Sequence, residues 1–394
     1  MLTTGYNFLV VNLARNKLLP RITSLSFFCL SLAYSIRTVA AGEVPGAIRA
    51  TLTSVYQYGF YSHATEADGN AINDRGRGSF VLDLQGTLTP GEHNTLFALG
   101  SFAHGNGLND TGGVSLVPNG DDLEDDVHNI NGTGRDYLLE AWYRRQLLDR
   151  QPVSIAVSGG LIDATRYLDS NRYANDNITQ FMNETFVNRF FLPSYDPGIS
   201  VETAGDDWRL NMVWMRARAD TDNNGWTDYD FYGIDLTREF HFPVGEGHIS
   251  LHAQTTSNDL EARDGNGNNA ALNAVTLSVD QAIGETFGVF VRAGTANNDT
   301  ATLVHDALYS AGFEIGGHGI GLPELVVGVA YAYLDGAGNQ PGGISHSRVA
   351  ETYARYPRGT IGDISADAQW ISDSVDDGQN PGLRVIGSRL NLYF

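Results

Sequence analysis

The sequence predicts an all-β fold, a transmembrane antiparallel β-barrel of about 16 strands. Three observations support this prediction. They are an export signal at the N-terminus, short alternating segments along the rest of the chain, and an alternating last segment that ends on Phe394. Residues 1–41 are expected to be the signal peptide and residues 42–394 the barrel domain.

The N-terminal region has the three parts of a secretory signal. Arg15, Lys17 and Arg21 precede an apolar stretch at 25–34, and small residues follow at 39–41. The apolar stretch is too short to span a bilayer, which needs about 20 residues. Cleavage after Ala41 would also remove the single cysteine, Cys29. We therefore expect neither disulfides nor thiolate metal sites in the mature protein.

The charge balance is strongly acidic. The formal net charge is −21 for the whole chain, and it becomes −25 without the signal, which carries four positive charges and no negative ones. Binding to nucleic acid needs clustered Lys or Arg, so no nucleic-acid partner is expected. Most of the acidic residues are expected on solvated loops.

Short alternating segments recur along the chain, separated by clusters of Gly, Asn and Asp. Side chains alternate across a strand, so each segment has one apolar and one polar face. In an outer-membrane barrel the apolar face meets lipid and the polar face lines the lumen. Closure of the barrel then pairs the backbone groups that lipid cannot satisfy. Segments of this kind are 80–88, 138–144, 248–254, 275–280 and 386–394.

The connections between strands fall into two length classes. The stretches 89–92, 148–152 and 242–246 are expected as short periplasmic turns, and 104–135, 220–230, 256–270 and 335–348 as extracellular loops. The strand over 208–219 mixes its parities, which predicts a bulge. Residues 220–225 partly match a calcium loop, but Phe231 stands where the bidentate acid belongs. An acidic loop is therefore expected there.

One long polar segment, 159–188, does not alternate. Its Gly160, Asp163 and Asp169 are followed by Ala174-Asn-Asp176 and Thr179-Gln-Phe-Met-Asn183. Towards the C-terminus, Glu351-Thr-Tyr353 precedes the Ala-Asp-Ala-Gln-Trp-Ile stretch at 366–371 and then Asn380-Pro-Gly382. Together these motifs resemble the carbohydrate-selective porin family (OprB-type). The sequence departs from the family at Trp370, where Tyr is usual, and at 365–366, where Pro is common.

The resemblance implies an outer-membrane porin through which small polar solutes, preferentially carbohydrates, diffuse passively. It also implies an inward-folded constriction loop, for which the segment 163–191 is the candidate: folded into the lumen, it would narrow the channel. A sugar needs hydrogen-bonding groups and aromatic ring faces, and its binding must stay weak for it to leave. Arg166 and Arg172 are expected to pair with Asp163 and Asp169. The candidate solute-binding residues of the segment are Asp163, Arg166, Asp169, Asn171, Arg172, Asn175, Gln180 and Asn183.

Strand parity adds further candidates on the barrel wall. Glu140, Trp142 and Arg144 share one face of their strand. An Arg facing lipid at the midplane would cost about 2–4 kcal/mol, so this face is expected to line the lumen. Weaker lumen candidates are Arg209, Arg216, Arg218 and Arg292.

Two other functions remain open: a general ion-selective porin, and a plugged barrel that serves as an adhesin or structural anchor. The histidines show neither a zinc-protease motif nor a pairing with a nucleophilic serine. We therefore expect no enzyme activity, catalytic residue, metal site or cofactor. The expected partners are sugars and outer-membrane lipid, and a homo-oligomer is an open alternative.

Overall fold

The computed structural model describes residues 45–66, 69–187, 190–221, 225–338, 343–376, 378 and 380–394. The signal peptide expected over 1–41 lies outside the described residues. Among the residues that are described, no helix is both long and apolar enough to cross a membrane.

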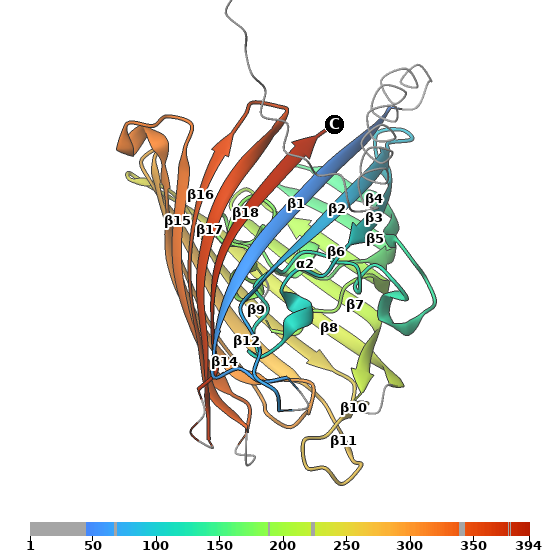
Figure 1. The fold of residues 1–394 in the computed structure, drawn as a ribbon. Helices are drawn as coiled ribbons and strands as arrows, with labels where there is room; N and C mark the ends of the chain where they lie inside the picture. Colours follow the sequence, from blue (N-terminus) through green and yellow to red (C-terminus); the bar gives the residue numbers. More distant parts are fainter. Residues whose placement is uncertain are drawn as a thin grey trace, which may run out of the picture. The chain divides into compact units, whose positions relative to one another are not determined.

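Within the described part of the chain, sixteen strands close into one antiparallel barrel, as predicted (Figure 1). The strands pair in sequence order, and β1 closes the ring by pairing with β18. β10 (Leu260–Glu261) and β11 (Asn269–Ala270) form a separate two-stranded sheet. The barrel strands are β1 (Gly46–Ser62), β2 (Arg75–Leu88), β3 (Asn94–His104), β4 (Leu138–Arg150), β5 (Val153–Ile162), β6 (Asp196–Ala204), β7 (Trp208–Thr221), β8 (Gly225–Phe242), β9 (Gly245–Thr256), β12 (Asn273–Ile283), β13 (Phe287–Ala296), β14 (His305–Gly316), β15 (Val326–Gly336), β16 (Ile344–Pro357), β17 (Gly362–Val375) and β18 (Gly382–Tyr393).

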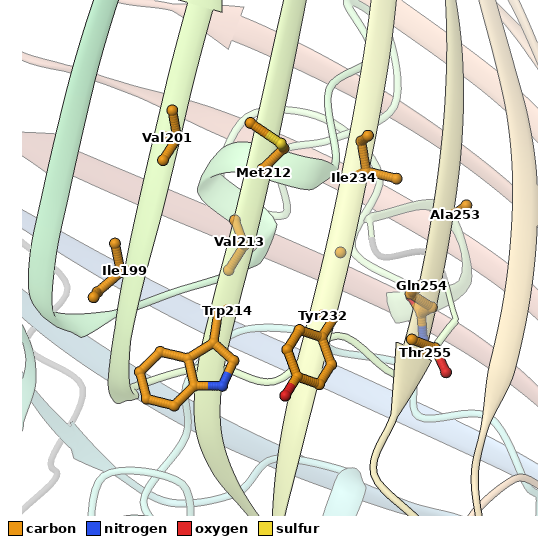
Figure 2. A pocket seen from close by; sticks show the side chains of 11 residues that line it. Ile199, Val201, Met212, Val213, Trp214, Tyr232, Ile234, Ala253, Gln254 and Thr255 are labelled. Carbon is orange, nitrogen blue, oxygen red and sulfur yellow. The ribbon is translucent and has the colours of Figure 1, made fainter.

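The alternating sequence places apolar side chains on the outer face of the barrel. On β9, Ile249 and Leu251 are 40% and 51% exposed, whereas Ser250 and His252 are buried. Figure 2 shows the same outer face on β6–β9, where a shallow apolar groove is lined by Ile199, Trp214, Tyr232 and their neighbours. An outward band of this kind suits hydrocarbon, because lipid competes for no hydrogen bonds.

The C-terminal strand follows its predicted parity. Ile386 and Leu390 are exposed on the outer face, while Arg389 and Asn391 are buried on the inner face. Phe394 exchanges two backbone hydrogen bonds with Ala50 of β1, at 2.9 and 3.1 Å. The end of the chain therefore takes part in closing the barrel.

The three predicted short turns join strands as expected. The prediction of a loop at 220–230 is wrong, because β7 extends to Thr221 and β8 begins at Gly225. β7 and β8 pair without a register shift from Trp208↔Arg238 to Thr221↔Gly225, so the bulge expected in 208–219 is wrong as well. The mixed parity has another cause. Arg216 and Arg218 stand on the outer face of β7 with Trp214, and Arg218 lies 2.7 Å from Asp228 of β8. Ion pairs between the two strands allow charged residues to occupy their outer face, so both strands continue into the stretch that was expected to be a loop.

Candidate lumen site

The long polar segment connects the end of β5 to the start of β6 and runs through the lumen. β5 has 10 residues and ends at Ile162, and β6 has 9 residues and begins at Asp196, which pairs with Ile162. The segment contains two short helices, α2 (Thr165–Leu168) and α3 (Glu184–Val187). Helix α2 lies inside the barrel against β7 and β8 (Figure 1), and α3 contacts β15. The segment therefore reaches several walls of the barrel.

A buried ion pair fastens the segment to β13. The guanidinium of Arg292 lies 2.8 Å from the carboxylate of Asp169, and both side chains are buried. Arg292 also donates to the Phe186 carbonyl at 2.8 Å and to the Asn175 side chain at 3.2 Å. On the neighbouring β12, Ser278 accepts a hydrogen bond from Asn171 at 2.9 Å. The lumen position expected for Arg292 is confirmed, whereas the one expected for Arg216 and Arg218 is wrong, because both stand on the outer face of β7.

The next part of the segment is fastened to β16 and β17. The backbone N–H groups of Met182 and Asn183 donate to Glu351 at 2.6 and 3.0 Å. The Asn183 side chain donates to Gln369 at 3.1 Å. The motif at 179–183 thus contacts the C-terminal motif residues that carry the family resemblance. Their joint role is to hold the segment against the wall.

Arg166 lies between an acidic and an aromatic partner on the opposite wall. Its Nε donates to Glu140 Oε2 at 3.0 Å, and a second nitrogen bonds Glu140 Oε1. Its guanidinium carbon is 4.9 Å from the ring centre of Phe97 and 5.8 Å from that of Trp142. The two rings stack at 4.7 Å. Since the Arg166 side chain remains 39% exposed, this aromatic–arginine cluster faces open space in the lumen.

The expected pairing of Arg166 with Asp163 is wrong. Asp163 instead accepts hydrogen bonds from the backbone and hydroxyl of Thr165 at 2.9 and 2.6 Å, and from the Ser194 hydroxyl at 2.9 Å. A carboxylate two residues before a helical turn can satisfy the free N–H groups there, and this local bond competes with a distant cation.

The expected pairing of Arg172 with Asp169 is also wrong. Arg172 Nη1 lies 3.4 Å from Glu246 of β9, and the Arg172 backbone donates to Asp280 of β12 at 3.2 Å. Asp169 is occupied by Arg292, which is buried and therefore needs a buried counter-charge. Nearer the short-turn end of β4, Arg144 pairs with Glu202 of β6 at 2.8 Å.

The stretch 104–135, which was expected as an extracellular loop, forms a second long loop, and its part at 115–122 folds inward. The side chains of Gln57 and Gln369 both donate to the carbonyl of Pro118, at 3.1 and 2.8 Å. Gly120 donates to the Met182 carbonyl at 2.8 Å, and Tyr195 donates to Asp122 at 2.6 Å. The two inward loops therefore support each other.

This second loop brings carboxyl groups into the lumen. Burial and the nearby charge of Asp83 together raise the pKa of Asp121 to about 7. Burial also raises the pKa of Asp126 to about 6 and that of Asp122 well above its usual range. Asp121 and Asp126 therefore change their charge near neutral pH.

The sequence-predicted residues divide into two sets. Asp169, Asn171, Asn183 and Glu140 are at most 8% exposed and are bonded to neighbouring segments or walls. The other set retains exposed surface, and it comprises Asp163, Arg166, Arg172, Asn175, Gln180, Trp142 and Arg144.

Sequence reasoning missed Phe97, which stacks on Trp142, and the inward fold of 115–122. The inward parity of Phe97 on its strand was the available signal for the first. The second has no local signal, because it depends on Gln57 and Gln369, which lie far away in the chain.

Comparisons with known proteins agree with this architecture. No family model matches the sequence. An uncharacterised protein of Aquifex aeolicus (strain VF5) is 29% identical over 300 residues, which are 75% of this chain and 82% of that protein. OprB of Pseudomonas putida superposes with a TM-score of 0.66 at 13% identity, covering 89% of this chain and 94% of that one. The outer-membrane channel DcaP of Acinetobacter baumannii superposes with a TM-score of 0.55 at 10% identity, covering 89% and 97%.

Identities this low establish a shared fold. Over its described residues, this chain has the closed 16-stranded fold of the outer-membrane porins, as its resemblance to the OprB-type family predicted.

Proposed function

We propose that this chain is an outer-membrane porin that mediates passive diffusion of small polar solutes, with a preference for carbohydrates. The observation that carries the proposal is the exposed Arg166 beside the stacked Phe97 and Trp142, inside a closed barrel. The guanidinium donates hydrogen bonds to hydroxyl groups, and the exposed parts of the rings offer surface to a sugar ring.

The environment of Arg166 favours weak and rapid binding. Glu140 already engages two of its nitrogens, so the side chain is preorganised and has few donors left for a solute. A solute would exchange water for a small number of hydrogen bonds, and it could leave as easily as it enters. The likeness to OprB supports the same assignment.

Liposome swelling and block of single-channel current by sugars test the proposal. Swelling should be fastest for small sugars and should fall as sugar size increases. Arg166→Gln should raise the half-blocking sugar concentration about tenfold, because a charge-assisted hydrogen bond contributes about 1.5–3 kcal/mol. Arg238→Gln is the matched control, since Arg238 is on the outer face of β8 and pairs with Asp207.

The same measurements separate the two alternatives. The carboxyl groups of Asp121 and Asp122 on the inward part of the second loop favour an ion-selective porin as the second candidate, because ionised carboxylates in a lumen attract cations. In that case the barrel conducts ions, but sugars do not block its current. A barrel that conducts no current in a planar bilayer would be plugged, and both transport functions would then be refuted.

A further inference from the structure

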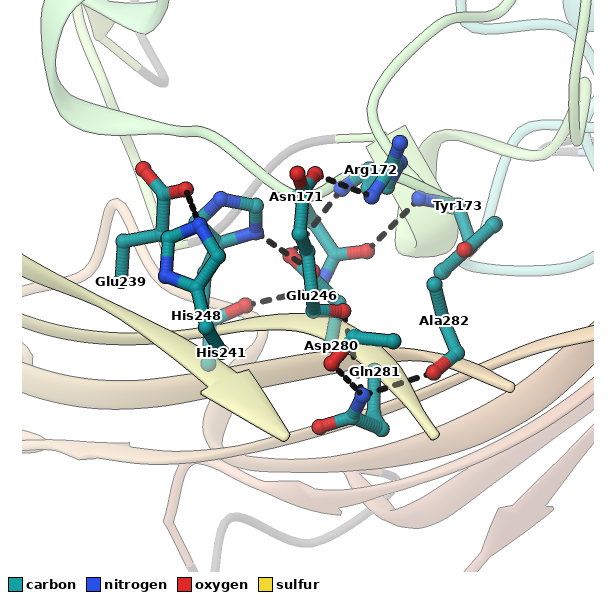
Figure 3. Close-up of polar contacts among 12 residues, drawn as sticks. Asn171, Arg172, Tyr173, Glu239, His241, Glu246, His248, Asp280, Gln281 and Ala282 are labelled. Carbon is teal, nitrogen blue, oxygen red and sulfur yellow. Dashed lines mark hydrogen bonds and ion pairs between the residues drawn. The ribbon is translucent and has the colours of Figure 1, made fainter. Parts of the chain in front are cut away.

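Two glutamates and two histidines form a patch on the inner face of the β8–β9 hairpin. Glu239 and His241 are on β8, and Glu246 and His248 are on β9. In the register, His241 lies opposite Glu246 and Glu239 lies opposite His248. Residues two apart share a face of a strand, so all four side chains project to the same side. Figure 3 shows the four side chains close together, and they flank the short turn that joins β8 to β9.

The spacing of their donor atoms suits a metal ion. One ligand atom from each of Glu239, His241 and Glu246 lies within 4.8 Å of the others. His241 Nε2 is already 3.2 Å from Glu239 Oε1. Around a tetrahedral zinc ion with bonds of about 2.0–2.2 Å, neighbouring ligand atoms lie roughly 3.3–3.6 Å apart. Small side-chain rotations would close the set, and the His241 and Glu246 side chains are 66% and 51% exposed, so an ion can reach them.

His248 has the surroundings of a fourth ligand. Its Nδ1 lies 2.7 Å from Asp280 Oδ1, and Asp280 is buried on β12 (Figure 3). A carboxylate on one ring nitrogen orients the imidazole and directs the lone pair of the other nitrogen, here Nε2, to a metal. His248 lies directly opposite Glu239 in the register and on the same face of the hairpin, although it is not among the three residues whose ligand atoms lie within 4.8 Å of one another.

The backbone under the patch is held in place. The side chain of Gln281 donates to the carbonyls of Gly245 and Glu246, both at 3.1 Å, and to that of Ala282 at 2.7 Å. A Cβ at Gly247 would meet the Asp280 carbonyl at 3.0 Å, so glycine allows this close approach. The glutamate and histidine of β9 thus project from a fixed strand end.

We propose that Glu239, His241, Glu246 and His248 form a binding site for a divalent transition metal of the zinc class. Imidazole nitrogen with carboxylate oxygen is the donor set that zinc, nickel and copper prefer, whereas calcium and magnesium take oxygen alone. The site is separate from the cluster at Arg166, and its occupancy does not depend on what the channel transports.

Arg172 couples this site to the lumen segment. Its Nη1 lies 3.4 Å from Glu246 Oε2, so it competes with a metal for the same carboxylate (Figure 3). Metal binding would replace this ion pair, while Asn171 and the Arg172 backbone stay bonded to β12. The metal would therefore free one side chain of the segment without detaching the segment.

Equilibrium dialysis of the folded mature chain in detergent, without a histidine tag and after chelator treatment, tests the proposal with zinc chloride. We expect one zinc ion per chain. His241→Ala and Glu246→Gln should each weaken binding by about tenfold or more. Arg172→Gln should strengthen it about two- to fivefold, because it removes the competing cation. His93→Ala, in an exposed turn at the same end, should leave binding unchanged.

The predicted effects have opposite signs: loss of a ligand weakens zinc binding, and loss of Arg172 strengthens it. A general disturbance of the fold would not strengthen binding. Heat-modifiable gel mobility identifies variants that fold. If the wild-type chain retains no zinc, or if His241→Ala binds zinc as His93→Ala does, the site does not exist. If millimolar calcium displaces zinc as readily as nickel does, the histidines are not ligands and the proposal is overturned.

Discussion

Arg292 is expected to be the main buried anchor of the lumen segment, and its substitution tests how the channel is narrowed. Arg292→Met keeps much of the side-chain volume and removes a cation that is paired with the Asp169 carboxylate. It also removes the donors to Phe186 and Asn175. We expect a less stable barrel in which the segment moves.

The magnitude follows from burial. Both Asp169 and Arg292 are at most 3% exposed, so the single substitution removes a buried cation that lies 2.8 Å from a buried carboxylate. Removal of one partner of a buried pair costs about 3–5 kcal/mol. The double variant Asp169→Asn/Arg292→Met buries no charge, and we expect it to recover about 1–3 kcal/mol of that loss.

Denaturant unfolding in detergent measures the free energies, and planar-bilayer recordings measure the conductance. Arg292→Met should show a larger and noisier conductance than the wild type. Arg238→Met, which breaks an exposed pair on the outer face, should change stability by only about 0–1 kcal/mol. If the Asp169 and Arg292 substitutions are additive within about 0.5 kcal/mol, the two residues do not act as a pair, and the reasoning is refuted.

Three further predictions concern the lumen and the wall. Because the pKa values of Asp121 and Asp126 are raised to about 7 and 6, both groups take up protons as the pH falls through this range. The permeability of the channel to cations relative to anions, measured as a reversal potential, should then fall between about pH 8 and 5. Asp121→Asn should reduce this fall. A reversal potential that does not depend on pH would contradict the prediction. Trp142→Ala should weaken sugar block and leave ion conductance present, and equal sugar block in both proteins would exclude the ring from the solute path. Gly160→Ala should destabilise the barrel by about 1–3 kcal/mol, because its φ of +145° suits glycine and a Cβ there would meet a backbone carbonyl of β4. Gly86→Ala, where a Cβ meets open space, is the control for that unfolding measurement.

The predictions that succeeded rest on local periodicity. Alternation with a period of two decides which side chains share a face, and it needs only neighbouring residues. The outward Ile249 and Leu251, the inward Ser250 and His252, and the closing strand to Phe394 follow from it. The departure of 159–188 from this period singled the segment out, and its motifs, through their resemblance to the OprB-type family, predicted that it enters the barrel.

The candidate site could be predicted only as a set of residue types. Which cation meets which carboxylate depends on residues that are distant in the chain: Arg292 is 123 positions from Asp169, and Gln369 is 251 positions from Pro118. One sequence signal was available and passed over, the repeated Glu-x-His on both sides of the turn at 242–246, whose meaning depends on the hairpin register.

The sequence by itself determined the barrel class and the sidedness of its strands, because these depend on the spacing of residues along one strand. The lumen segment was predicted through the resemblance of its motifs to a known family. The tertiary structure alone decided the partners of Arg166 and Arg172, the inward fold of 115–122 and the grouping of the β8–β9 histidines. Those contacts join parts of the chain that only closure of the barrel brings within a few ångströms, and a buried charge takes whichever counter-charge that closure places beside it.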